Sequence, residues 1–163
     1  MLVIGYGNAL RGDDGIGRAI AEQVASWNLP HVRSLSLHQL TPELAEELSR
    51  VDRAVFIDAC IDSDSIRIEP IDADKNSQVL GHSLTPRSLL GMAQWLYDRA
   101  PEAWLISVPG ETFEFSDRLS PTAEGYVTEV LALVRDLFTK NPDSSQKPGS
   151  NTSKPSSRID QYS

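Results

Sequence analysis

The sequence predicts an α/β fold, a three-layer αβα sandwich around a mostly parallel, twisted sheet of about five strands. Short apolar segments of strand length alternate along the chain with longer segments in which apolar residues recur every three or four positions. This alternation of strands and helices is typical of a sheet covered by helices on both faces. The length of 163 residues, with 40% hydrophobic and 23% charged residues, fits one globular domain that buries its own core.

The first half of the chain is expected to form three strands separated by two helices. The strands are short segments, continuously apolar or alternating, at residues 1–6, 32–38 and 53–59. In the first helix, residues 15–27, isoleucine and valine residues four positions apart fall on one face. The second helix, residues 41–50, begins with Thr41 as the expected N-cap and Pro42 as the first helical residue.

The second half of the chain is expected to add two strands and two helices. Residues 65–71 alternate like a strand and follow the preceding strand after a short loop. We therefore expect this strand to run antiparallel, as a partner of the preceding strand or at an edge of the sheet. Residues 85–100 repeat the Thr-Pro start of a helix, residues 103–110 form an apolar strand, and residues 120–138 form a long closing helix.

The chain is predicted to be one folded domain, residues 1–140, followed by a disordered tail, residues 141–163. The tail is rich in Ser, Pro, Asn and Lys and has almost no apolar side chains. Such a segment buries too little surface to offset the conformational entropy that it would lose on ordering.

Charge and composition exclude several classes of partner. The net charge of −8 argues against nucleic acid, because phosphate binding requires a basic face. No apolar run approaches the roughly 20 residues of a membrane span, and the first residues lack the features of a signal peptide. The single cysteine, Cys60, excludes an internal disulfide and a zinc site of several cysteines. We expect a cytoplasmic monomer with no nucleic-acid or membrane partner.

The loop between the first strand and the first helix has a glycine-rich pattern but does not suit a nucleotide. Gly5 and Gly7 fit a dinucleotide-binding loop, yet the third glycine of that motif is replaced by Leu10. Asp13 and Asp14 would also repel a pyrophosphate. One aspartate can cap the helix, and if Asp13 does so, asparagine would replace it at a cost of about 1 kcal/mol or less. Capping leaves Asp14 without a role.

A third aspartate and two histidines are expected near the same edge of the sheet. Asp58 ends the third strand, and in a parallel sheet the first and third strands end at the edge where α/β folds bind ligands. An aspartate at a strand end can also simply form a turn. His38 and His82 also fall at this edge. Asp14, Asp58 and a histidine would form an open set of ligands for a divalent transition metal.

Three stretches of the sequence resemble the hydrogenase maturation endopeptidases. They are "GYGNALRGDDGIG", "VFIDA" and the loop from His82 into the next helix, and the resemblance covers about residues 1–138. This family removes a C-terminal extension from the large-subunit precursor of nickel-iron hydrogenases after nickel insertion. The resemblance implies that Asp14, Asp58 and His82 are the metal-binding and catalytic residues, whereas Arg87 stands where some members have the histidine. The segment "HSLTPRSLL" and the chain length resemble those of the subgroup that serves bidirectional, NAD-linked hydrogenases.

The resemblance implies a metal-dependent endopeptidase whose nickel is supplied by the substrate. Oxygen and nitrogen ligands without cysteine form an open site, which can contact a nickel ion that substrate cysteines already hold. The ion, or a water on it, would then polarise or attack the scissile amide. Cys60 is expected to be a small apolar filler, and no serine-elbow or helical zinc-protease motif is present. The alternative function is a non-catalytic chaperone that senses nickel insertion.

Overall fold

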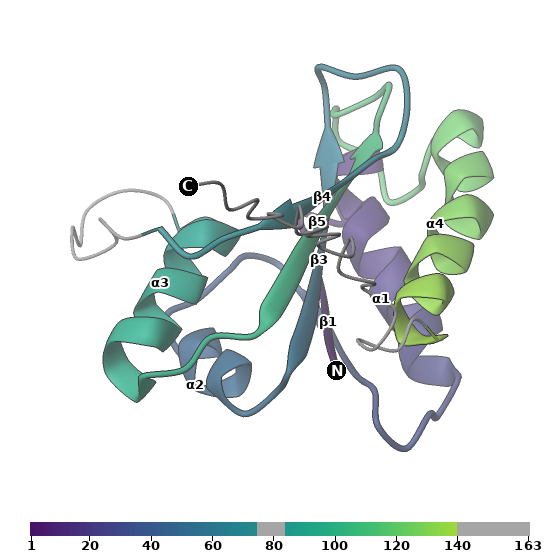
Figure 1. Ribbon diagram of the computed structural model, residues 1–163. Helices are drawn as coiled ribbons and strands as arrows, with labels where there is room; N and C mark the ends of the chain where they lie inside the picture. The colour runs from purple at the N-terminus through teal and green to yellow at the C-terminus, as the bar shows by residue number, and fades with distance from the viewer. Residues whose placement is uncertain (75–83, 140–163) are drawn as a thin grey trace, which may run out of the picture.

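The computed structural model describes residues 1–74 and 84–139, which form three layers (Figure 1). Within these residues, a five-stranded sheet has the order β2-β1-β3-β5-β4. The strands are β1 (Leu2–Tyr6), β2 (Arg33–Leu37), β3 (Arg53–Cys60), β4 (Arg67–Ile71) and β5 (Glu102–Pro109). The helices are the 3-10 helix η1 (Gly12–Gly15) and the α-helices α1 (Ile16–Ser26), α2 (Leu44–Ser49), α3 (Pro86–Tyr97) and α4 (Pro121–Thr139). The predicted α/β sandwich is confirmed.

The sheet has an apolar core on each face because both faces are covered by helices. Figure 1 shows α1 and α4 on one side of the sheet and α2 and α3 on the other. Along β1, Leu2 and Ile4 belong to the core beneath α2 and α3, whereas Val3 belongs to the core beneath α1 and α4. On β3, Phe56 and Ile57 divide in the same way. Strands buried on both faces account for the continuous apolar runs in the sequence.

All strand pairs in the sheet are parallel except β4 with β5. The prediction that residues 65–71 form an antiparallel strand is confirmed, and β4 lies at an edge of the sheet. Its partner is β5 and not the preceding strand, because β3 already pairs with β1 on one side and β5 on the other. The carboxyl ends of β1, β2, β3 and β5 therefore lie at one edge, which we call the carboxyl edge.

The two Thr-Pro pairs behave differently. At α3, Thr85 forms a capping box: its Oγ1 accepts from Ser88 N at 3.1 Å, and Ser88 Oγ accepts from Thr85 N at 2.8 Å. At α2 the prediction is wrong, because the helix begins at Leu44 and Glu43 is its N-cap. The Thr41 hydroxyl hydrogen-bonds the Glu43 side chain and caps no helical N–H group, and Leu44 N donates to the Thr41 carbonyl at 3.1 Å.

The glycines in and beside the first loop allow backbone segments to touch. A Cβ atom on Gly5 would lie 1.8 Å from the carbonyl oxygen of Gly17, and one on Gly17 would lie 2.3 Å from the carbonyl oxygen of Ile57. Gly7 has a φ of 139°, and its Cβ would lie 1.9 Å from the carbonyl oxygen of Asp14. The motif therefore packs the start of α1 against β1 and β3, and it brings the backbone of Asp14 against the end of β1.

Two predicted features fall outside the described residues: His82 and the tail, residues 141–163. Within the described part of the chain, no helix has both the length and the hydropathy required to cross a bilayer.

Candidate active site

Three groups converge at the carboxyl edge: Tyr6, Asp14 and Asp58. Gly5 on β1 is in register with Ile57 on β3, so Tyr6 and Asp58 are neighbours on adjacent strands. Leu2 and Ile4 face α2 and α3, and alternation along the strand places Tyr6 on the same face. Phe56 places Asp58 on that face by the same argument. The Tyr6 hydroxyl hydrogen-bonds Asp58.

Asp58 is a half-buried carboxyl group whose pKa is raised to about 6. Burial is the largest cause, because it disfavours the charged form. Hydrogen bonds from Tyr6 and from the Ala59 backbone lower this pKa, and the negative charge of Asp14 raises it. The predicted approach of Asp14 and Asp58 is therefore present in the structure. A carboxyl group with a pKa near 6 can hold or release a proton close to neutral pH, as a general base must.

Asp14 is half-buried, and the loop that follows β1 fixes its carboxylate. Its Oδ2 accepts a hydrogen bond from Asn8 N at 2.8 Å, and Asn8 Oδ1 in turn accepts from Leu10 N at 3.0 Å. Among the described residues, Asp14 Oδ1 has no hydrogen-bond donor. Asp14 thus has one anchored oxygen and one that can accept a ligand.

Asp13 does not take the capping role that the sequence left open for it. Its side chain is fully buried, and neither η1 nor α1 has a side-chain hydrogen bond at its N-cap. Asp13 accepts hydrogen bonds from Glu111 N at 2.8 Å, Thr112 N at 3.1 Å, Ser120 N at 2.7 Å and Ser120 Oγ at 2.8 Å. Burial raises its pKa, but these hydrogen bonds outweigh burial and hold the pKa below the usual value. Asp13 therefore ties the first loop to the connection between β5 and α4.

The histidine of the predicted ligand set is not placed, because His82 lies outside the described residues. Its rival, His38, follows β2 and is exposed. It lines a pocket of about 390 Å³ together with Tyr6, Gln39, Leu40 and Leu84. In the described part of the chain, no three His, Cys, Asp or Glu side chains are grouped to hold a metal ion. Of the three predicted ligands, the described residues therefore include Asp14 and Asp58.

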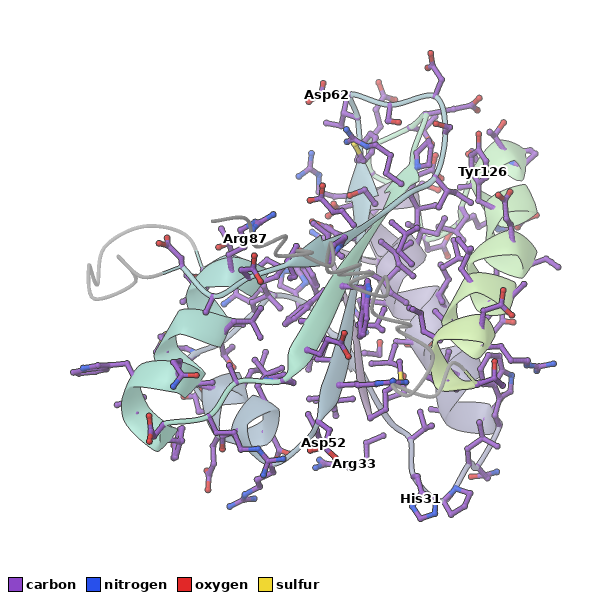
Figure 2. The ribbon with its side chains drawn as sticks, viewed as in Figure 1. His31, Arg33, Asp52, Asp62, Arg87 and Tyr126 are labelled. Atoms are coloured by element: carbon purple, nitrogen blue, oxygen red, sulfur yellow. The ribbon has the colours of Figure 1, made fainter. Side chains whose placement is uncertain are left out.

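The other candidate residues lie outside this group. Cys60 is half-buried and outside both apolar cores, where the Arg67 guanidinium lies 3.3 Å from its Sγ, so it is not the apolar filler we predicted. Arg87 lies 3.8 Å from Glu69 on β4. His31 is far from the carboxyl edge. Figure 2 shows it at the opposite end of the molecule from Asp62, which follows β3 at that edge.

Tyr6 is the residue of the site that sequence reasoning missed. The available signal was its position, because the last residue of an apolar strand at the carboxyl edge shares a face with every second residue before it.

No protein-family model matches the sequence, and no curated protein is detectably similar to it. Solved structures are similar to it in fold. The chain is similar to the hydrogenase 2 maturation peptidase of a Thaumarchaeota archaeon, with a TM-score of 0.65 and 22% identity over 85% of this chain and 97% of that one. The hydrogenase maturating endopeptidase HybD of E. coli gives 0.65 and 23%, over 84% and 90%. The [NiFe] hydrogenase maturation protease HybD of Thermococcus kodakarensis gives 0.63 and 20%, over 83% and 97%. The chain thus has the fold of the hydrogenase maturation proteases.

Proposed function

We propose that the protein is an endopeptidase that removes the C-terminal extension of a nickel-iron hydrogenase large-subunit precursor after nickel insertion. One observation carries the proposal: Asp14 and Asp58 lie together at the carboxyl edge of a fold that solved hydrogenase maturation proteases share. The resemblance of the first loop to that family supports the same substrate. The sequence of residues 82–90 favours, as the substrate, the precursor of a bidirectional, NAD-linked hydrogenase.

In the proposed reaction, Asp14, Asp58 and His82 contact a nickel ion that belongs to the substrate. The ion polarises the carbonyl group of the nearby scissile amide. The carboxylate oxygen of Asp58 that faces away from the ion takes a proton from the attacking water. As the C–N bond breaks, Asp58 returns the proton to the leaving nitrogen, and the carboxyl and amino products separate.

The decisive experiment incubates the protein with nickel-loaded and nickel-free precursor and follows the mass of the precursor. Cleavage of the nickel-loaded form alone is the expected result. Binding of that form without cleavage would contradict the proposal and identify the protein as a nickel-sensing chaperone. Equal cleavage of both forms would contradict the role of nickel in recognition.

We expect Asp14→Asn to lower the rate of processing on the order of 100-fold, by analogy with the loss of metal-site partners. Folding should change little, because the amide oxygen can still accept the hydrogen bond from Asn8 N. The matched control is Asp52→Asn, which removes an exposed carboxylate that pairs with Arg99 and contributes at most about 1 kcal/mol. Processing by Asp14→Asn at the rate of the control would exclude Asp14 as a ligand.

We expect His82→Ala to abolish processing and His38→Ala to reduce it only partly. His31→Ala is the matched control, since His31 precedes β2 and so lies at the end of the molecule opposite the carboxyl edge (Figure 2). An imidazole ligand must be unprotonated, so processing by the wild type should also fall as the pH drops below about 6.5. The assignment is wrong if His38→Ala abolishes processing and His82→Ala retains it, and His38 would then be the ligand.

A further inference from the structure

The pocket that Tyr6 lines is large enough to hold a side chain of a bound peptide. Tyr6, His38, Gln39, Leu40 and Leu84 line a volume of about 390 Å³. This volume is near the lower end of the range for small-ligand pockets, roughly 300 to 1,000 Å³. The pocket lies at the carboxyl edge, because Tyr6 ends β1 and His38 follows β2.

Tyr6 connects this pocket to the proposed base. Its side chain lines the pocket, and its hydroxyl hydrogen-bonds Asp58 on the adjacent strand. A group held in the pocket would therefore lie one side chain away from the carboxylate that activates water. In a protease, the parts of the substrate at that position are the residues on either side of the scissile bond.

The walls of the pocket define which side chain it can hold. Leu40 and Leu84 are apolar, and the Tyr6 ring is flat, so they suit an apolar body. His38 and Gln39 are exposed and offer hydrogen-bonding groups to a polar tip. The carboxylates of Asp14 and Asp58 nearby disfavour an anionic group, because like charges in a partly buried site repel.

We propose that this pocket holds the side chain of one of the two substrate residues that flank the scissile bond. The pocket accepts a side chain with an apolar body and a neutral or cationic polar tip, and it rejects Asp and Glu. This inference rests on the proposed protease function. It assigns Gln39 and Leu84 to substrate specificity and Tyr6 to the positioning of Asp58.

The test uses the nickel-loaded precursor, in which the cut is first located by mass spectrometry. Each flanking residue is then changed to Gln, Glu, Leu and Ala, and kcat/KM is measured for the wild type, Leu84→Ala, Gln39→Ala and Leu96→Ala. Leu96→Ala is the matched control, since Leu96 is an exposed leucine at the end of α3. We expect the wild type to prefer Gln over Glu at least tenfold at one of the two positions.

The two pocket variants should each change a different preference. Leu84→Ala should shift the preference between large and small side chains about tenfold, in the range known for one or two methylene groups. Gln39→Ala should reduce the preference for Gln over Leu several-fold, because a polar partner is lost. Since Leu84 packs partly against the core, the exposed Gln39 decides the result if Leu84→Ala does not fold.

Unchanged preferences in folded Leu84→Ala and Gln39→Ala would overturn the inference while leaving the proposed function intact, provided that the wild type cleaves the precursor. No cleavage by the wild type would overturn both. Tyr6→Phe keeps the ring in the pocket and removes only the hydroxyl, so kcat should fall about tenfold while the ranking of flanking residues is unchanged. An altered ranking with an unchanged kcat would contradict the positioning role of Tyr6.

Discussion

Replacement of Asp58 by asparagine is expected to abolish processing and, at the same time, to raise the free energy of unfolding at pH 7. The activity should fall by about 10² to 10⁴, the usual contribution of a general base, because an amide cannot take a proton from water. The gain in stability has a separate cause, which is the burial of the charged carboxylate. Lower activity together with higher stability distinguishes a residue that serves function at the expense of stability from one that only supports the fold.

The size and pH range of the stability effect follow from the pKa of Asp58, which is about 6 in the folded chain against a reference value of 3.8. Between these values the folded state binds more protons than the unfolded state, so the stability falls as pH rises through this range. At 1.36 kcal/mol per pKa unit, the loss is about 3 kcal/mol at pH 7. Asparagine avoids this loss, because it is always neutral and can still accept the hydrogen bond from Tyr6.

Urea unfolding at pH 4 and at pH 7 measures this effect. The difference in stability between Asp58→Asn and the wild type should be about 2 kcal/mol more favourable to the variant at pH 7 than at pH 4, because the carboxyl group of the unfolded chain is already partly ionised at pH 4. Asp52→Asn, at an exposed carboxylate, is the control and should show no such change. If Asp58→Asn is no more stable at pH 7, or if it still processes the precursor, the role of Asp58 as a buried base is wrong.

The position of Asp58 could be predicted from the sequence because it depends on regular geometry. An aspartate at the end of a buried parallel strand lies at the carboxyl edge, and the loop after the neighbouring strand lies beside it. The antiparallel direction of β4 followed from its short connection, whereas its partner depended on the path of β5 later in the chain. The two Thr-Pro pairs differ only through local hydrogen bonds, and Ser88 completes the capping box at Thr85.

The separate roles of Asp13 and Asp14 could not be predicted, because they depend on contacts distant in sequence. Asp13 bonds to groups about a hundred residues away, in the connection between β5 and α4. No local pattern distinguishes it from Asp14, since either aspartate could have capped the helix. Capping by Asp13, one of the roles that the sequence left open, does not occur in the structure.

Asp13→Asn is accordingly expected to destabilise the fold by about 3 kcal/mol or more, and not by the 1 kcal/mol that a cap would imply. Its carboxylate accepts hydrogen bonds from four atoms: Glu111 N, Thr112 N, and the N and Oγ atoms of Ser120. An asparagine amide presents one acceptor and one donor, so in either orientation at least one buried N–H faces another. An unsatisfied buried donor costs about 1 to 3 kcal/mol, and hydrogen bonds to a charged group contribute about 1.5 to 3 kcal/mol.

Thermal and urea unfolding of Asp13→Asn should show a loss that corresponds to a Tm lower by roughly 10 °C for a chain of this size. The matched control is Asp14→Asn, the same change at the next residue, which should unfold like the wild type. The sign of the pH dependence is opposite to that of Asp58. Because the pKa of Asp13 is lowered, its stabilisation is present above the unfolded pKa of about 4 and is lost as pH falls further. The loss of stability caused by Asp13→Asn should therefore become smaller in acid. If Asp13→Asn is as stable as the wild type at pH 7, the Asp13 hydrogen bonds do not anchor the first loop.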